Sequence, residues 1–212
     1  MESTTRLISV EGSIGAGKST LINLLKENFN NITFLTEPLK EYTTFKCHNP
    51  LTNLYVTPFT DCSVVQDFIT KSSFEYYKKN LIDTKTEKIV VTDRSFDSVL
   101  YFIDLYVNSG YITLDSANFL KQNYFSLKPH FNKFEKLFIF LDTNPSLCKR
   151  NILKRNRISE QNISIDLLNN LQKSILKFKN NLEDNHLTIK VEEKDSKQDI
   201  FTKFCNILQW KK

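Results

Sequence analysis

Short apolar runs alternate along the chain with longer segments that have room for helices. The runs are rich in Ile, Val, Leu and Phe, which is typical of β-strands. Strands are expected at RLISVE (6–11), ITFLTE (32–37), KIVVTD (88–93), KLFIFLD (136–142) and LTIKVEE (187–193). Helices are expected at about 18–28, 62–84, 98–108, 114–127, 146–154, 165–182 and 196–210.

This alternation predicts an α/β fold with a five-stranded parallel sheet that is covered by helices on both faces. No repeat, low-complexity tract or Pro/Gly/Ser-rich linker divides the sequence, so a single domain over residues 1–212 is expected. In open sheets of this kind, ligands gather at the carboxyl ends of the strands. The residues at those ends are Glu11, Glu37, Pro38, Asp93, Arg94 and Asp142.

A glycine-rich loop joins the first expected strand to the first expected helix. Its sequence GSIGAGKS satisfies the phosphate-binding pattern G-x-x-x-x-G-K-[ST] in the strand-to-helix context that the pattern requires. Glycines permit a tight turn whose N–H groups, together with the helix N-terminus, hold an anionic phosphate. The residues expected to bind ATP here are Gly12, Ser13, Ile14, Gly15, Ala16, Gly17, Lys18, Ser19 and Thr20.

Within this loop, Lys18 is expected to reach the β and γ phosphates, and the Ser19 hydroxyl to ligate Mg²⁺. The alternative is a glycine turn that merely closes a strand-helix unit. The Lys-Ser pair and its placement favour an NTP-binding enzyme.

Charged residues after the second and third strands narrow the chemistry. Glu37 can accept the proton of an attacking hydroxyl, and Arg94 can neutralise charge on a phosphoryl group during transfer. The alternatives are that Asp93 or Ser95 caps the following helix and that Glu37 is a solvated turn residue before Pro38.

Composition adds modest constraints. The chain has 29 Lys+Arg against 24 Asp+Glu, a net charge of +5, which a polyphosphate ligand explains as readily as a nucleic acid. Four cysteines without a CxxC pair argue against zinc and a disulfide framework, and are expected to be reduced core thiols. With no signal-like or membrane-spanning stretch, a soluble, cytoplasmic protein is expected.

Taken together, these motifs resemble the deoxynucleoside kinases, which include mitochondrial thymidine kinase, deoxycytidine kinase and deoxyguanosine kinase. The resemblance covers most of the chain and rests on EGSIGAGKST, LTEP, NLYVTPFTDCSVVQDF, DRS and KRNILKRNRISE, in matching order and spacing. It implies a P-loop nucleoside/nucleotide kinase fold and transfer of the ATP γ-phosphate to a deoxynucleoside 5′-hydroxyl. It also implies that Glu37 is the general base, that Arg94 lies beside it, and that Asp93 assists Ser19 near Mg²⁺.

The same resemblance implies a nucleoside site. Tyr55 corresponds to the tyrosine at the sugar 3′-hydroxyl, Gln66 to the glutamine that pairs with the base edge, and Tyr42 to an aromatic over the ribose or base. An amide suits base recognition because it both donates and accepts. Without the resemblance, packing aromatics and an exposed helical glutamine are the favoured interpretations.

The most basic stretch of the chain, at about 150–162, is expected to be an arginine-rich lid. Arg155 and Arg157 match the lid pair of the family, and Arg150 is one residue out of register with the preceding lid arginine. All three are expected to contact ATP. Glu160 corresponds to a lid carboxylate that meets the sugar 3′-hydroxyl. The alternative is a solvated helix face.

Two apolar positions bear on the choice of nucleoside. Relatives that accept cytosine or purines carry an Asp five residues beyond the DRS arginine, and Val99 stands there in this chain. Ile69, three residues beyond Gln66, is apolar as well. Because an apolar wall tolerates the thymine methyl group, thymidine or a pyrimidine deoxynucleoside is the preferred substrate.

Two rival functions remain. Thymidylate kinases share the P-loop and a DR segment but usually read REPGG where this chain has TEPLK. A P-loop NTPase would need a water-positioning residue, and arginines concentrated in one lid argue against it. Expected partners are ATP-Mg²⁺, a nucleoside and a second copy of the chain, with helices around SVLYFIDLYV and ANFLKQNYF forming a homodimer; no nucleic-acid or membrane partner is expected.

Overall fold

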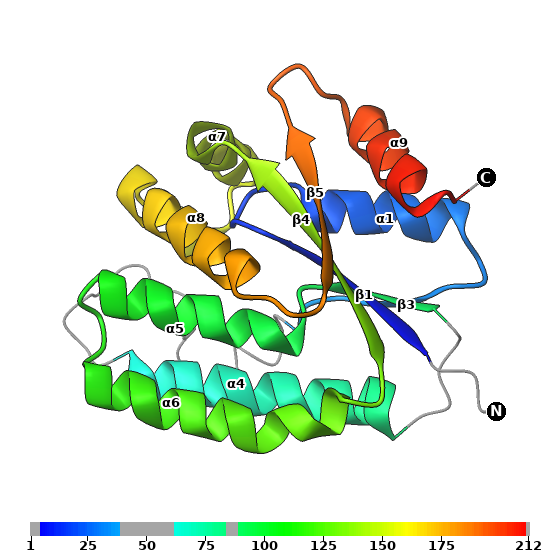
Figure 1. Ribbon diagram of the computed structural model, residues 1–212. Coiled ribbons are helices and arrows are strands. Elements are labelled where there is room, and N and C mark those ends of the chain that lie inside the picture. The colour runs from blue at the N-terminus through cyan, green and yellow to red at the C-terminus, as the bar shows by residue number, and fades with distance from the viewer. Residues whose placement is uncertain (1–4, 39–61, 84–88, 211–212) are drawn as a thin grey trace.

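A single parallel sheet organises the molecule (Figure 1). The computed structural model describes residues 5–38, 62–83 and 89–210. Within these residues the strand order is β2-β3-β1-β4-β5, and every pairing is parallel. The strands are β1 (Arg6–Gly12), β2 (Thr33–Leu35), β3 (Ile89–Asp93), β4 (Glu135–Thr143) and β5 (Asn185–Val191). The predicted α/β class and five-stranded parallel sheet are confirmed.

Helices cover both faces of this sheet. They are α1 (Lys18–Asn28), α4 (Ser63–Tyr77), α5 (Val99–Asn108), α6 (Leu114–Leu127), α7 (Pro145–Arg155), α8 (Ile165–Asn180) and α9 (Lys197–Leu208). Helices α1 and α9 pack together on one side of the sheet, while α5 packs against α8 and α6 on the other (Figure 1). A π-helical turn at Lys78–Ile82 extends α4, and 3₁₀ turns lie at Phe96–Ser98, Lys128–Phe131 and Ile158–Glu160.

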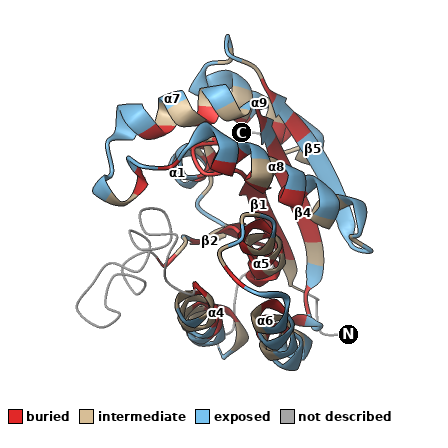
Figure 2. Cartoon of the chain, turned by 90° about the vertical axis from the view of Figure 1, so that its left-hand side faces the viewer, coloured by how far each residue is buried: buried red, intermediate tan, exposed pale blue. Residues whose placement is uncertain are grey.

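The interior is built from the central strands. Residues of β1 and β4 are buried almost without interruption, as expected for parallel strands with helices on both faces (Figure 2). The rings of Phe138 and Phe140 on β4 lie 6.0 and 6.4 Å from that of Phe178 on α8, and the Tyr101 ring of α5 lies 5.6 Å from the same ring. This aromatic cluster fixes α5 and α8 relative to the sheet.

Most element boundaries differ from the sequence-based prediction by one to a few residues, and three of these differences are described here. Strand β2 ends at Leu35, so Glu37 lies beyond the sheet. The regular α-helix predicted to Thr84 ends at Tyr77, and the chain continues as the π-helical turn. Strand β5 ends at Val191, because the register with β4 ends where Thr143 pairs with Val191.

Cys62, Cys148 and Cys205 are buried and free of disulfides, as predicted for core thiols; Cys47 lies outside the described residues. In the described part of the chain, no helix combines the length and apolar character that crossing a bilayer requires.

Candidate active site

The glycine loop between β1 and α1 requires glycine for two different reasons. Gly12, Gly15 and Gly17 have φ angles of 142°, 81° and 100°, in the region that L side chains rarely adopt. At Gly15 there is also no room, because a Cβ there would lie 2.4 Å from the carbonyl oxygen of Cys148 on α7. The loop is therefore seated directly on α7, and Asn151 of that helix donates a hydrogen bond of 2.9 Å to the Gly15 carbonyl.

Lys18 opens α1 and turns its ammonium back over this loop. Its Nζ donates to the carbonyls of Gly12 and Ser13 at 3.2 and 2.9 Å. Burial, with a contribution from the nearby Arg94 charge, lowers the pKa of Lys18 to about 8. A buried cation at the start of the helix can neutralise phosphate oxygens in the loop.

The next helical residue, Ser19, faces a carboxylate from the neighbouring strand. Its Oγ donates to Oδ2 of Asp93 at 2.6 Å, while Asp93 Oδ1 is buried and has no hydrogen-bond partner among the described residues. A hydroxyl and a carboxylate with a free oxygen are the hard donors that Mg²⁺ prefers, so the pair fits that ion. The described residues hold no group of three or more His, Cys, Asp or Glu side chains placed to bind a metal ion.

Arg94, directly after Asp93, has a left-handed backbone conformation with φ of 69°. Its buried guanidinium donates through Nη1 to the Gly12 carbonyl at 3.0 Å and to the Tyr101 hydroxyl, and its carbon lies 4.9 Å from the Phe102 ring centre. Its Nε lies 3.6 Å from Oε2 of Glu37, an ion pair without a hydrogen bond at that nitrogen. The sequence-predicted acid and arginine are thus adjacent.

The pKa of Glu37 is higher than that of an ordinary glutamate. Although 28% of its side chain is exposed, desolvation of the carboxyl end raises its pKa, and the negative charge of Asp93 adds to this effect. The cations Arg94, Lys18 and Arg157 oppose the shift without reversing it. A carboxylate with a raised pKa is suited to accept a proton near neutral pH.

A first hollow, lined mostly by uncharged side chains, opens beside Glu37 and Arg94. Gln66 on α4 is 2% exposed, and its Nε2 lies 3.4 Å from the Thr70 hydroxyl. The lining residues are Glu37, Pro38, Gln66, Ile69, Ser73, Tyr77, Asp93, Arg94, Ser95, Ser98, Val99, Phe102 and Tyr106. In the described part of this wall, the charged side chains are confined to the Glu37 end.

A second hollow lies on the other side of the glycine loop, between α7 and the β5–α9 connection. It is lined by loop and α1 residues 15–21, by Leu147, Arg150, Asn151, Lys154 and Arg155, and by Val191, Glu192, Glu193, Asp195, Ser196, Lys197 and Ile200. Arg150 forms an ion pair with Glu193 across this hollow. Its lining carries five basic side chains, from Lys18, Arg150, Lys154, Arg155 and Lys197, and three acidic ones, from Glu192, Glu193 and Asp195.

A third hollow shares lining residues with each of the other two. Both Glu37 and residues of the expected lid line it. It is lined by Ile14, Gly15, Lys18, Ser19, Ile22, Asn23, Thr36, Glu37, Asp93, Arg94, Phe102, Arg155, Arg157 and Glu160. The Glu160 carboxylate accepts from Nε of Arg155 at 2.6 Å and from Nη1 of Arg157 at 3.3 Å, so it holds both lid arginines beside the hollow. Helix α7 ends at Arg155, and the left-handed conformation of Asn156 directly after it turns the chain toward Arg157 and Glu160.

A family model described as deoxynucleoside kinase matches residues 8–209 of this sequence. The chain belongs to the deoxynucleoside kinase family. It is 32% identical over 172 residues to the probable deoxycytidine kinase of fowlpox virus, an overlap of 78% of this chain and 68% of the relative. It is 24% identical over 163 residues to the mitochondrial thymidine kinase 2 of Homo sapiens, covering 76% of this chain and 60% of that protein.

A third relative, the mitochondrial deoxyguanosine kinase of Xenopus laevis, is 25% identical over 190 residues, which cover 80% of this chain and 71% of the relative. The names of these three relatives refer to three different nucleosides. Membership of the deoxynucleoside kinase family therefore leaves the base open.

In this family member, two of the sequence-predicted nucleoside contacts, Tyr42 and Tyr55, lie outside the described residues. Sequence reasoning gave no role to Ser73, Phe102 and Tyr106, which line the first hollow. Ser73 had a detectable signal, since it follows Gln66 and Ile69 on one face of a helix. Phe102 and Tyr106 had no such signal, because apolar helical positions are typical of any core.

Proposed function

We propose that this deoxynucleoside kinase transfers the γ-phosphate of ATP to the 5′-hydroxyl of a deoxynucleoside, with thymidine or another pyrimidine deoxynucleoside preferred. The observation that carries the proposal is the third hollow, which Glu37, Arg94, Lys18 and the two lid arginines, Arg155 and Arg157, line together. This hollow shares Glu37 and Arg94 with the first hollow, and it shares Lys18 and Ser19 with the second. A hydroxyl from one side and a phosphate from the other can therefore reach the same acid.

In the proposed reaction, a Glu37 carboxylate oxygen takes the proton of the 5′-hydroxyl. The hydroxyl oxygen forms a bond to the γ-phosphorus while the bond from that phosphorus to the bridging β–γ oxygen breaks, which leaves ADP. Arg94 neutralises charge on the phosphoryl group during transfer. Its Nε faces Glu37 without a hydrogen bond and remains available for a substrate oxygen.

The donor phosphates are held by the chain from three directions. The glycine loop supplies N–H groups, Lys18 supplies a buried positive charge, and Arg155 and Arg157 close over the phosphates from the lid at about 150–162. Arg150 and Thr20, both exposed, line the second hollow, where the phosphate donor would bind. Ser19 and Asp93 would hold Mg²⁺, which when bound neutralises charge on the phosphates.

The preference for thymidine is supported by the wall around Val99 and Ile69. Both side chains line the first hollow, where the nucleoside acceptor would bind, and Val99 is 5% exposed. A described wall without a charged group at the base end offers no ionic contact to an exocyclic amine and accommodates a methyl group. Gln66 would pair with the base edge, and Glu160 would contact the sugar 3′-hydroxyl.

A substrate panel tests the proposal. Thymidine, deoxycytidine, deoxyadenosine, deoxyguanosine and thymidylate are each supplied with ATP-Mg²⁺, next to a reaction without acceptor, and ADP and phosphorylated product are measured. The highest kcat/KM is expected for thymidine. A purine substrate would contradict the base preference, product from thymidylate alone would indicate a thymidylate kinase, and undiminished hydrolysis without acceptor would indicate an NTPase.

Gln66→Ala tests the acceptor site separately. Loss of a buried contact with two hydrogen bonds should reduce discrimination between bases by about 1–3 kcal/mol, because the partner atoms on the base are left unpaired. The ratios of kcat/KM among the nucleosides of the panel measure this discrimination. Ratios equal to those of the wild type would remove Gln66 from base recognition.

We also propose that the protein acts in the cytoplasm as a homodimer. Helix α5 contributes less to such a contact than its sequence indicated, because Tyr101, Ile103, Leu105 and Tyr106 are buried within the subunit. On α6, Phe119 and Phe125 are 54% and 55% exposed. Light scattering after size-exclusion chromatography measures the mass in solution, and a monomer would contradict the proposed dimer.

A further inference from the structure

A buried carboxylate outside the proposed catalytic set lies behind Arg94. Glu11, the penultimate residue of β1, is fully buried, and its carboxylate accepts three hydrogen bonds from the start of the helical segment after β3. The donors are the Ser95 backbone N–H at 2.8 Å, the Ser98 hydroxyl at 2.8 Å and the Tyr101 hydroxyl at 2.9 Å. Sequence reasoning placed Glu11 at a strand end without giving it a role.

Tyr101 connects this carboxylate to the arginine. Its ring is fully buried, and burial raises the pKa of Tyr101 well above its ordinary value, so the phenol keeps its proton. The proton is donated to Glu11, and the phenol oxygen accepts from Nη1 of Arg94. A chain of hydrogen bonds thus runs from Glu11 through Tyr101 to Arg94.

This chain determines which edge of the guanidinium faces Glu37. Nη1 has two hydrogens, and Gly12 and Tyr101 accept both of them. Arg94 consequently cannot offer Nη1 to Glu37, and the guanidinium is held with Nε 3.6 Å from Oε2 of Glu37, beyond hydrogen-bond distance. A guanidinium released from Tyr101 would be free to move toward Glu37 and to form a two-bond pair through Nε and Nη2, the strongest arrangement that these groups make.

We propose that Tyr101, anchored by Glu11, is a positioning residue that keeps Arg94 from closing on Glu37, so that the carboxylate remains available to substrate. This inference rests on the proposed function of Glu37 as the base. Neither Tyr101 nor Glu11 touches substrate in this proposal. Both act by fixing the arginine.

Tyr101→Phe tests the proposal because it removes one oxygen from a site that otherwise keeps its shape. Tyr124→Phe is the matched control: Tyr124 is equally buried, and its hydroxyl donates to buried Asp97 rather than to the Arg94 network. Both variants lose a buried hydrogen bond, but only the first releases Arg94. With the deoxynucleoside that the wild type uses best, Tyr101→Phe should lower kcat by about ten- to a hundredfold and leave the KM for ATP within about twofold.

Tyr124→Phe should keep the wild-type kcat. An unchanged kcat in Tyr101→Phe, or an equal loss in both variants, would overturn the proposal. If Tyr101→Phe does not fold, Glu11→Gln takes its place under the same criteria, since the amide leaves the tyrosine without its carboxylate acceptor.

A crystal structure of the variant gives a readout that does not depend on activity. The gap between Arg94 Nε and Glu37 Oε2 should close from 3.6 Å to hydrogen-bond distance. A guanidinium that stays in place would overturn the positioning role even if no nucleoside were a substrate. Absence of nucleoside phosphorylation by the wild type would instead contradict the proposed function alone.

Discussion

At the scale of single residues, the position of Glu37 between Arg94 and the acceptor hollow leads to a kinetic prediction. Glu37→Gln keeps the shape of the side chain but cannot take a proton. We expect kcat to fall by about a hundredfold to ten-thousandfold with the KM for ATP little changed. Glu27→Gln, on the exposed face of α1, is the control and should be fully active. Full turnover in Glu37→Gln would remove this residue from the mechanism.

Lys18 leads to a prediction about pH. With its pKa lowered to about 8, the free enzyme loses the ammonium charge above that pH, so kcat/KM for ATP should fall as pH rises through about 8. The stability of the free protein should change in the opposite direction. Between pH 8 and the ordinary pKa of 10.5, the unfolded state binds more protons at this lysine, so its contribution favours folding more as pH rises.

A pH series of initial rates and of urea unfolding measures the two trends. In Lys18→Arg, whose guanidinium does not titrate in this range, the residual activity should lack the alkaline fall. A wild-type kcat/KM for ATP that stays level to pH 10 would contradict the shifted pKa.

Motif spacing was sufficient to predict the residues at strand ends. Lys18, Ser19, Glu37, Asp93 and Arg94 meet because parallel strands bring their carboxyl ends to one edge. The buried hydrogen bonds that hold Arg94 in place could not be predicted from the sequence. Glu11 is adjacent to the glycine loop, yet its partners come from residues 84 or more positions away, and no local pattern encodes that contact.

At the scale of secondary-structure elements, the loop and α7 depend on each other through Gly15. Gly15→Ala should destabilise the free protein by about 2–5 kcal/mol, because its Cβ would collide with the Cys148 carbonyl in addition to the φ penalty. Gly17→Ala is the matched variant: it has a similar φ but no atom within 4 Å of the added Cβ, and should cost only about 1–2 kcal/mol. Urea unfolding distinguishes them, and equal losses would contradict the proposed collision.

Element type was predicted better than element ends. Buried strands such as β4 have an unbroken apolar run, which fixes them clearly. Strand β5 lies at the sheet edge and is largely exposed, so its ends are set by pairing with β4 rather than by its own pattern. Strand β2 was overestimated because its pairing with β3 ends at Leu35, and Thr36 and Glu37 pair with no strand among the described residues.

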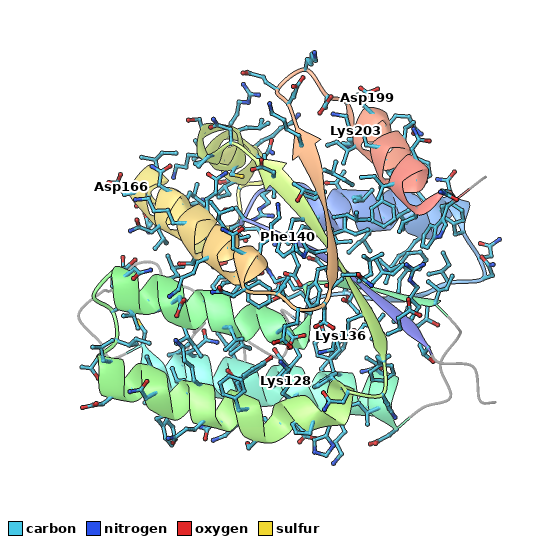
Figure 3. All side chains as sticks on the ribbon, in the orientation of Figure 1. Lys128, Lys136, Phe140, Asp166, Asp199 and Lys203 are labelled. Carbon is cyan, nitrogen blue, oxygen red and sulfur yellow. The ribbon has the colours of Figure 1, made fainter. Side chains whose placement is uncertain are left out.

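At the scale of the whole molecule, a buried ion pair joins the start of β4 to the helical layer. Lys136, seen at the base of β4 in Figure 3, lies 3.0 Å from Asp97, and both side chains are under 10% exposed. Lys136→Met should destabilise the protein by about 3–5 kcal/mol, because it leaves a carboxylate buried without its cation. Thermal or urea unfolding measures the loss.

Lys71→Met is the control for this pair. It breaks the exposed contact between Lys71 and Asp67 on α4 and should cost less than about 1 kcal/mol. In the double variant Asp97→Asn with Lys136→Met, much of the stability should return, since no buried charge remains. A double variant as unstable as Lys136→Met alone would show that the loss comes from packing.

The strand order places β1 between β3 and β4, and the donor and acceptor hollows open on opposite sides of its end. Under the proposed function, the phosphate donor binds in one of these hollows and the nucleoside in the other. Both must be present together for the chemistry to occur, so double-reciprocal plots should intersect rather than run parallel, and either compound can be the first to bind. Product inhibition should follow the same logic: ADP should compete with ATP, and the nucleoside monophosphate with the nucleoside.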